Sequence, residues 1–472
     1  MPITNKLRRG LDRKVWQAMT PCPTTNGAGM FIMTNPTGFG REALYVCSAT
    51  TIYLYDHEED AWVQLPASGI AGAFGAGACG AFHKNGPTGT AVSGSTAASL
   101  KTNLTIPRSI AGYAVRITSG PGAGEERTIT HNTKGANSVL SFDTPFSVAL
   151  TTASTYLLLT GRFWFFCPGT SAVGLRYWDR ALSAWSAAMS VTGLPTSFGT
   201  EGRLVATYGG RTDLATGTAT GGSTTTLVNS AKNWKVNQFV NMQVRILTGT
   251  GAGQTKLITG NTATTLTVEG TWTAPTAGSE YVIEGCDDFL YLFGNNAVTL
   301  YRYRISTNTW ETLAPTTARG GAMGAGGGAN WVARVSDPEW NNEDDLLNGR
   351  YIYSFRGAGA NTLDRYNIPE NKWENALTYG NQGTTFTTGS SYDLDGDCIY
   401  CSKEGTGRIH RFDIAKNLME ANTTLLVPNG TATVGDKMWI WRFAPDGPEG
   451  DSLPFVYYLQ HTLTSLFRAM LF

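Results

Sequence analysis

The sequence repeats one short pattern five times, and this repetition constrains the fold more than any other feature. In each copy an aromatic residue precedes a polar residue, and a bulky residue, usually tryptophan, follows six positions after the polar one. The copies are Tyr55-Asp56 with Trp62, Trp178-Asp179 with Trp185, Tyr303-Arg304 with Trp310, Tyr366-Asn367 with Trp373, and Phe412-Asp413 with Met419. A unit that recurs along a chain is typical of folds in which each repeat buries its apolar face against the next.

Each copy follows an apolar run rich in β-forming residues, and a short turn separates the run from the copy. The runs span residues 43–47, 163–166, 289–293, 351–355 and 398–401. This order predicts three consecutive strands for each repeat. Glycine-rich segments can supply a fourth, innermost strand, because small residues suit a strand crowded around a central axis. These segments span residues 71–81, 204–210, 320–328 and 383–390.

Composition agrees with an all-β fold. Glycine accounts for 56 of 472 residues, charged residues for 15% and aromatic residues for 11%, a profile of short strands and tight turns. The 36 basic and 36 acidic side chains cancel, which excludes attraction of the whole chain to nucleic acid or to an anionic membrane. No apolar run is long enough to cross a membrane, and none follows the basic N-terminal arm, so we expect neither a membrane span nor an export signal. The seven scattered cysteines predict reduced, buried thiols.

The repeated pattern resembles the blades of kelch-type β-propellers, which end in a similar succession of aromatic residue, turn and tryptophan. Segments 437–443 and 455–459 would begin a sixth blade, and the N-terminal stretch around Trp16 resembles the outer strand after Trp310. The five repeats and these terminal segments together predict an all-β, six-bladed β-propeller closed by the N- and C-terminal segments. Large side chains at the repeated position can lie between neighbouring blades and pack them together; they are Trp16, Trp62, Trp185, Trp310, Trp373 and Met419.

Two insertions interrupt the repeats, and they are similar to one another. Residues 115–130 align without gaps to residues 244–259, with nine of sixteen identities. Both copies contain a Gly-Ala-Gly turn, whose glycines are Gly122, Gly124, Gly251 and Gly253. Alternating apolar and polar residues around these turns predict two small β-sandwich or barrel-like modules.

The repeats and insertions together divide the chain into five segments. Residues 1–88 hold the N-terminal arm, the closing outer strand, the first blade and the inner strand of the second. The first module spans residues 89–160, and residues 161–216 complete the second blade and begin the third. The second module spans residues 217–285, and residues 286–472 hold the rest of the propeller. Each module lies between the first two strands of its blade, so both are expected on the same face.

The motifs that suggest chemistry have simpler interpretations. A phosphate-binding loop needs a helix after its glycines, and strands follow both Gly-Ala-Gly turns. The run 393–397 with Glu404 resembles a calcium loop but lacks the central glycine. Cys398 and Cys401 have zinc-like spacing, yet on a strand they point to opposite faces. We therefore expect no metal, no cofactor and no catalytic residues, although the acidic clusters at 56–60 and 343–345 leave a glycosidase possible.

The modules resemble small β-modules that recur in tail and fibre proteins of tailed bacteriophages. A propeller with such insertions also resembles the nozzle proteins of short-tailed phages. These resemblances imply a structural virion protein, a tail nozzle, hub or tail-associated ring component, that is assembled in the host cytoplasm and located in the virion tail. Its partners would be other tail proteins and further copies of itself in a ring, with nucleic acid only as DNA that passes through a channel.

A second function class is a receptor-binding module for carbohydrate on the host surface. Aromatic side chains of the modules could stack on sugar rings, and burial in a core is the alternative for each of them. The candidates are Tyr113, Trp234, Trp272 and Tyr281. A propeller glycosidase is the third class.

Overall fold

The computed structural model describes residues 16–24, 31–34, 42–48, 51–57, 59–70, 74, 77–168, 173–196, 198, 202–209, 213–294, 297–324, 326–333, 348–377, 391–395, 398–402, 407–428, 437–443, 453–460 and 464–470. Within these ranges the regular secondary structure consists of strands alone, which confirms the all-β prediction. The strands form six antiparallel sheets of four strands and two larger sheets. In these ranges no helix is long and apolar enough to span a membrane.

The four-stranded sheets follow one another along the chain, and their strands are listed here from first to last. Sheet 1 consists of β2 (Ile32–Thr34), β3 (Glu42–Ser48), β4 (Thr51–Asp56) and β5 (Ala61–Gln64). Sheet 2 consists of β6 (Cys79–His83), β13 (Arg162–Pro168), β14 (Val173–Asp179) and β15 (Ala184–Trp185). Sheet 3 consists of β16 (Gly202–Ala206), β24 (Phe289–Gly294), β25 (Leu300–Arg304) and β26 (Thr309–Thr312).

The last three sheets complete the series. Sheet 4 consists of β27 (Gly328–Trp331), β28 (Tyr351–Phe355), β29 (Leu363–Asn367) and β30 (Lys372–Glu374). Sheet 5 consists of β31 (Ser391–Asp395), β32 (Cys398–Ser402), β33 (Arg408–Asp413) and β34 (Leu418–Leu426). Sheet 6 consists of β35 (Lys437–Phe443), β36 (Leu453–Leu459), β37 (Leu466–Met470) and β1 (Gln17–Met19), so a strand near the N-terminus pairs with the last strand described.

The repeated pattern forms the hairpin between the last two strands of sheets 1 to 5. In each sheet the aromatic residue and the bulky residue are direct cross-strand partners. The pairs are Tyr55 with Trp62, Trp178 with Trp185, Tyr303 with Trp310, Tyr366 with Trp373, and Phe412 with Met419. The polar residue that follows the aromatic one accepts a backbone hydrogen bond from the residue three positions on in four of the five hairpins, as in Asp179 with Leu182 and Asn367 with Glu370.

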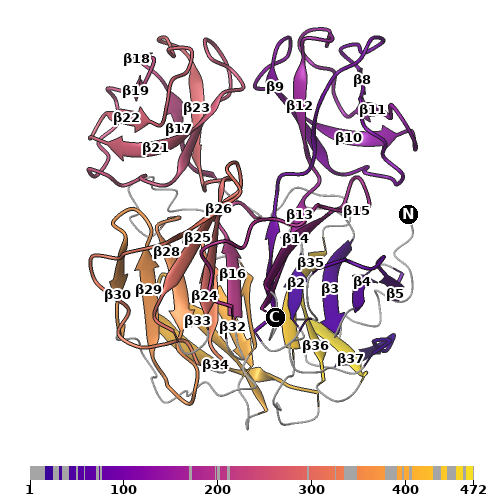
Figure 1. The fold of residues 1–472 in the computed structure, drawn as a ribbon, viewed down its shortest axis with the longest axis vertical. Helices are drawn as coiled ribbons and strands as arrows, with labels where there is room; N and C mark the ends of the chain where they lie inside the picture. Colours follow the sequence, from indigo (N-terminus) through magenta and orange to yellow (C-terminus); the bar gives the residue numbers. More distant parts are fainter. Residues whose placement is uncertain are drawn as a thin grey trace.

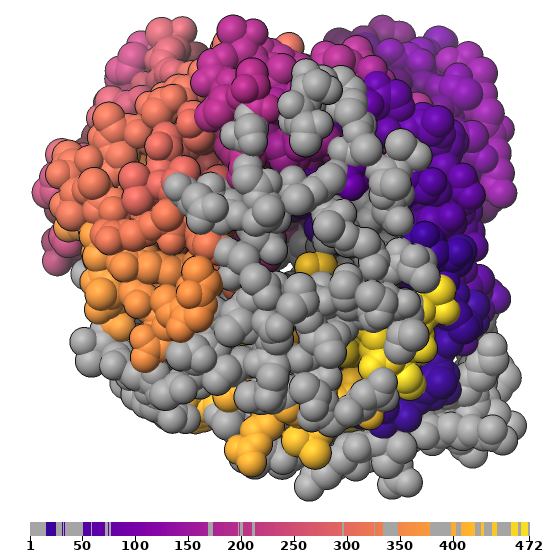
Figure 2. Space-filling view, turned by 60° about the horizontal axis from the view of Figure 1, so that its bottom comes forward, coloured from indigo at the N-terminus to yellow at the C-terminus, as the bar shows by residue number. Residues whose placement is uncertain are grey.

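The sheets are arranged around the molecule in chain order. Their first strands contact one another in the order β2, β6, β16, β27, β31 and β35, and β35 contacts β2. Figure 2 shows the same order on one face, from indigo through magenta and orange to yellow, which lies beside indigo. Three of the glycine-rich segments overlap these first strands, 71–81 with β6, 204–210 with β16 and 320–328 with β27. The fourth, 383–390, lies outside the described residues and directly precedes β31. At Gly202, in β16, a Cβ would lie 2.3 Å from the backbone oxygen of Gly77, so the close approach of these two segments requires glycine.

Apolar side chains fill the space between each sheet and the preceding one. We call Trp16, Trp62, Trp185, Trp310, Trp373 and Met419 the marker residues. Each marker belongs to, or packs against, the cluster between its own sheet and the sheet before it. Trp62 packs between sheets 6 and 1, Trp185 between 1 and 2, Trp310 between 2 and 3, Trp373 between 3 and 4, Met419 between 4 and 5, and Trp16 between 5 and 6.

The two larger sheets are the inserted modules; their first six strands have the same order, and module 2 adds a seventh strand, β18. Module 1, residues 88–159, has the order β7 (Thr88–Thr90), β12 (Thr155–Leu159), β9 (Ala114–Ser119), β10 (Glu126–Asn132), β11 (Val139–Phe142), β8 (Ser99–Lys101). Module 2, residues 213–284, has the order β17 (Asp213–Thr218), β23 (Glu280–Glu284), β20 (Gln243–Ile246), β21 (Thr255–Asn261), β22 (Thr265–Val268), β19 (Thr226–Val228), β18 (Gly221–Ser223). Strand β17 begins before the expected boundary at 217 because it pairs with β23 as far as Asp213 and Glu284.

The modules also share polar contacts that involve buried side chains. In module 1 the hydroxyl of Tyr156 donates to Asn103 over 2.8 Å, and in module 2 Asn229 donates to the hydroxyl of Tyr281 over 2.9 Å. A buried asparagine on the second strand of each Gly-Ala-Gly hairpin accepts a backbone N–H at the corresponding place: Asn132 from Ile110 in module 1, and Asn261 from Phe239 in module 2. Satisfied buried polar groups of this kind specify one packing arrangement.

Candidate functional site at the base of the two modules

The two modules stand side by side on one side of the six sheets (Figure 1). The linker into module 1 and both linkers of module 2 form one hydrogen-bonded junction. Nε2 of His83, at the end of β6, lies 2.8 Å from the backbone oxygen of Asp287, beyond β23. Asn85 donates from Nδ2 to the Asp287 carboxylate over 2.9 Å, and the Lys84 amide donates to the Tyr208 carbonyl over 2.7 Å. The linker into module 1 is therefore bound to both linkers of module 2.

Two buried arginines at corresponding positions of the modules reinforce this junction. Arg116 forms an ion pair with Glu126 at 3.0 Å and donates to the Tyr208 hydroxyl over 3.2 Å. Arg245 makes a two-pronged ion pair with Glu284, with N–O distances of 3.0 and 3.2 Å. Buried guanidinium and carboxylate groups need such partners because desolvation of an unpaired charge is costly.

The electrostatics of the junction are those of a structural network. Burial opposes ionisation of Glu284, but the charges of Arg245 and Arg116 more than offset it and lower the pKa of this carboxyl. Burial raises the pKa of Asp287 and lowers the pKa of His83 to about 4. His83 is therefore neutral at pH 7, and it accepts from the Asn85 amide at Nδ1 while Nε2 donates to Asp287. These groups hold the linkers together, because each is engaged by another protein group.

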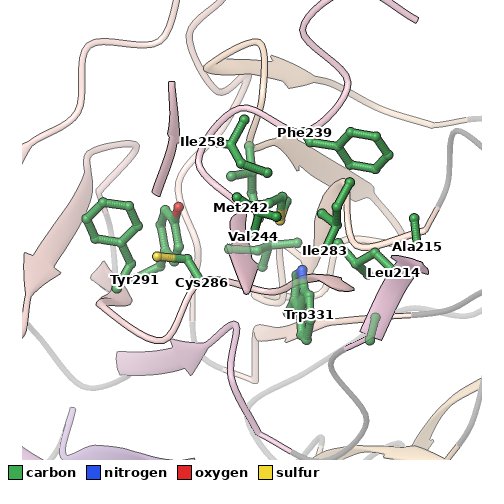
Figure 3. Packing of buried hydrophobic residues seen from close by; sticks show 14 of the residues in the cluster. Leu214, Ala215, Phe239, Met242, Val244, Ile258, Ile283, Cys286, Tyr291 and Trp331 are labelled. Carbon is green, nitrogen blue, oxygen red and sulfur yellow. The ribbon is translucent and has the colours of Figure 1, made fainter. Parts of the chain in front are cut away.

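Module 2 is fixed to sheets 3 and 4 by a continuous apolar core. Figure 3 shows Met242 and Val244 of module 2 in the same cluster as Tyr291 of sheet 3 and Trp331 of sheet 4. Polar contacts at its edge add to this attachment. Arg302 of β25 donates to Asn241 over 2.9 Å, and Asn241 donates to the carbonyl of Ile368 over 3.2 Å.

Module 1 has a core of its own. Among the described residues, its apolar cluster includes a single residue from outside the module, Ala181, which lies next to sheet 2. The guanidinium of Arg180 lies over the ring of Tyr113 at 5.1 Å, a cation–π contact. Module 1 therefore depends more than module 2 on the polar junction for its position.

The marker residues connect neighbouring sheets by hydrogen bonds as well as by packing. Their indole N–H groups donate to backbone carbonyls of the preceding sheet's outer segment. Trp62 donates to Thr20 over 2.9 Å, Trp185 to Pro66 over 3.0 Å, Trp310 to Ser190 over 2.8 Å, and Trp16 to Leu426. Trp373 instead packs under the guanidinium of Arg319, at 4.8 Å from its ring.

A position that sequence reasoning missed lies two residues before the marker in each hairpin. These residues all have positive φ, and they are Asp60, Ser183, Asn308, Asn371 and Asn417. Asp60 and Asn308 accept both the hydroxyl of the repeat's tyrosine and a backbone N–H of the preceding sheet, Thr20 and Ser190 respectively. The recurrence of Asp, Asn or Ser at this offset was the available signal, since these residues tolerate the left-handed conformation.

The four aromatic residues proposed for sugar stacking lie in the cores of the modules. Tyr113, Trp234, Trp272 and Tyr281 are 7%, 3%, 5% and 0% exposed. Each belongs to the apolar cluster that includes its module's core, and Tyr113 also lies under the guanidinium of Arg180. Core packing, the alternative interpretation, accounts for all four. Stacking on sugar, which the sequence left open for them as an alternative, would need a ring face that these buried side chains do not expose.

The glycines of the two turns have the geometry of hairpins. Gly122, Gly124, Gly251 and Gly253 all have φ between +82° and +90°, in turns that join β9 to β10 and β20 to β21.

No metal site is found in the described parts of the chain, where no group of three or more His, Cys, Asp or Glu side chains is arranged to hold an ion. Cys398 and Cys401 pack in different inter-sheet clusters, on opposite faces of β32. Glu404, the acidic cluster at 343–345 and the basic arm lie outside the described residues. The six cysteines whose side chains are described are buried, and none of them is in a disulfide.

The comparisons with known proteins add no relative to this description. Neither a protein-family model nor a curated protein matches this sequence.

Proposed function

We propose that the six four-stranded sheets form a closed, kelch-like six-bladed β-propeller. Three observations support this. The first strands contact one another in a continuous order that returns from β35 to β2. An apolar cluster with one marker residue lies between each pair of consecutive sheets. Strand β1 pairs with β37, which covers a sheet edge that would otherwise be open.

The function that we propose is structural: a component of a tailed-bacteriophage virion, as a tail nozzle, hub or tail-associated ring protein that acts by protein–protein assembly. The observation that carries this proposal is the pair of like modules that stand side by side on one side of the six four-stranded sheets. Such a pair is suited to bridging neighbours in an assembly. The buried network at its base serves rigidity, since its charged groups are paired within the chain.

In this proposal the chain is not an enzyme and works without a cofactor. Its partners are other tail proteins and further copies of the chain in a ring, with DNA passing through the ring's channel. It is located in the virion tail after assembly in the host cytoplasm.

The test is the mass of the purified chain by light scattering, alone and mixed with virions or tail proteins. We expect a discrete multiple of the chain mass, or stable co-assembly with tail proteins, and a ring in electron micrographs. A chain treated identically after thermal unfolding serves as the control for non-specific association. A strictly monomeric chain that ignores virions would contradict the proposal, and binding on a glycan array would then favour the receptor-binding alternative.

A further inference from the structure

The Gly-Ala-Gly turns of the two modules have matching internal geometry. In module 1 the Gly124 amide donates to the carbonyl of Ile117 over 2.9 Å, and in module 2 the Gly253 amide donates to that of Ile246 over 2.9 Å. Ala123 and Ala252 occupy the same place in the two turns. The turns are thus two copies of one local structure.

These two turns lie against each other, and the contact is reciprocal. A Cβ added to Gly124 would lie 2.0 Å from the backbone oxygen of Leu247 and 3.3 Å from the Cβ of Ala252. A Cβ added to Gly253 would lie 2.5 Å from the backbone oxygen of Thr118 and 3.2 Å from the Cβ of Ala123. Thr118 and Leu247 are equivalent in the alignment of the modules. Each turn therefore meets the other through equivalent positions, as in the interface of a two-fold symmetric dimer.

The last glycine of each turn differs from the others in what surrounds it. At Gly122 the nearest neighbour of an added Cβ is Leu150, in its own module, and at Gly251 it is Gln254, also in its own module. At Gly124 and Gly253 the nearest neighbour is backbone of the other module. Positive φ explains all four glycines as turn residues. Of these four positions, only 124 and 253 need glycine for a second reason, which is the close approach of the other module.

We propose that the Gly-Ala-Gly turn is a homotypic recognition surface whose partner is the same turn of a second module. In this chain each turn is the binding partner of the other. Together with the linker junction, they make the modules a single two-module unit. This inference concerns contacts within one chain, and it stands or falls independently of the proposed role in a virion.

Thiol bridging in the full chain tests whether the turns face each other in solution. Ala123→Cys and Ala252→Cys place one thiol on each turn, next to the last glycine of the other. Thr133→Cys and Thr262→Cys form the matched control, since these exposed, equivalent residues directly follow β10 and β21. Figure 1 shows the strand pairs β10–β11 and β21–β22 on the outer sides of the two modules. With a short dithiol crosslinker in dilute solution, we expect intrachain bridging of the first pair and none of the second. Equal bridging in both pairs, or none in either, overturns the proposal.

Alanine substitutions then test the role of the last glycine. Gly124→Ala and Gly122→Ala carry the same positive-φ strain, because their φ values are +90° and +82°. Only the first places a methyl group against the backbone of the other module. In the Ala123→Cys, Ala252→Cys background we expect Gly124→Ala to lose bridging and Gly122→Ala to keep it. Equal behaviour of the two variants would mean that the glycines serve the turn alone. Should Gly124→Ala fail to fold, the bridging of the parent pair still decides the question.

Discussion

In several of the hairpins one residue with positive φ joins neighbouring sheets, as Asp60, Asn308 and Asn371 do. Asn308 has a φ of +55°, which few side chains adopt without strain. Its Oδ1 accepts the Tyr303 hydroxyl of its own sheet over 2.5 Å and the Ser190 amide of the preceding sheet over 2.7 Å. The side chain thus couples hairpin geometry to the packing of sheet 3 on sheet 2.

We predict that Asn308→Ala destabilises the fold more than Asn308→Gly. Glycine keeps the positive φ and loses only the hydrogen bonds, each worth about 1 kcal/mol. Alanine adds roughly 1 kcal/mol of backbone strain. Thermal unfolding of both variants measures the difference. Asn137, exposed and with a φ of +51°, supplies the control, because the same two substitutions there report strain without those contacts. Equal losses for Asn308→Gly and Asn137→Gly would show that the hydrogen bonds contribute little.

A buried carboxylate in sheet 4 gives a second residue-scale prediction. Asp364 is fully buried and accepts from Arg319 and Arg356 at 3.0 and 2.8 Å. Burial by itself would raise the pKa of Asp364, but the hydrogen bonds from Arg356, the Ala376 amide and Arg319 more than offset it, so that the pKa is lowered. The folded state therefore holds this group ionised at pH values where the unfolded chain binds a proton.

The stability that Asp364 contributes is fully present above its ordinary pKa, near 4, and is lost as the pH falls through the lower folded value. Asp364→Asn leaves two arginines without their anion, and we expect a loss of about 3–5 kcal/mol at pH 7. The difference between variant and wild type should shrink as the pH is lowered below about 4. Denaturant unfolding at several pH values measures it. A difference that is constant down to pH 2 would contradict a buried ionised aspartate.

At the scale of elements, the two modules share the order of their first six strands but have different attachments. Module 1 closes its own apolar cluster, whereas the cluster of module 2 continues into sheets 3 and 4. Leu140 and Leu266 lie on corresponding strands, β11 and β22, and both are 0% exposed. They are a matched pair for probing how far a local defect spreads.

We predict that the local destabilisation caused by Leu140→Ala stays within its module, whereas that caused by Leu266→Ala extends into neighbouring sheets. Each removes a buried side chain at a cost of about 2–5 kcal/mol. For Leu140→Ala, increased hydrogen exchange should be confined to residues 88–159. For Leu266→Ala, it should extend to β24 and β28, because the disturbed cluster includes their side chains. Exchange measured by mass spectrometry distinguishes the two patterns. If Leu140→Ala increased hydrogen exchange in sheet 2 as much as Leu266→Ala does in β24 and β28, module 1 would share an apolar core with the four-stranded sheets.

At the scale of the whole molecule, the pairing of β1 with β37 joins the two ends of the chain. Arg468 of β37 donates to Gln17 over 2.8 Å, and Trp62 of sheet 1 donates to Thr20, just after β1. Strand β1 therefore covers the edge of sheet 6 and also supports sheet 1. An uncovered edge strand is a template for association between chains.

We predict that truncation of residues 1–24 lowers the melting temperature and promotes aggregation, because it exposes the edge of β37 and removes the acceptor of Trp62. Truncation of residues 1–15, which keeps β1, is the matched control and should behave like the full chain. Thermal unfolding followed by light scattering compares them. If both truncations are equally stable and monodisperse, β1 does not close the sheet.

The sequence by itself determined the local architecture. The apolar runs, the turn residues and the repeated pattern predicted the last three strands of sheets 1 to 5, because these features join residues close together in the chain. The structure then showed that the aromatic residue and the marker are direct cross-strand partners, as in Tyr303 with Trp310. Alignment of residues 115–130 with 244–259 likewise predicted two like modules, since equal patterns bury equal faces.

Only the tertiary structure decided which distant segments meet. His83 binds the carbonyl of Asp287, 204 residues away, and Trp310 donates to Ser190, 120 residues away. The sequence could not show whether Trp234 and Trp272 are buried or exposed, because tryptophan occurs both in cores and on binding surfaces. The reciprocal contact of Gly124 and Gly253 was hidden for the same physical reason: a turn glycine is required by φ alone, and the neighbour that also requires it comes from another part of the chain.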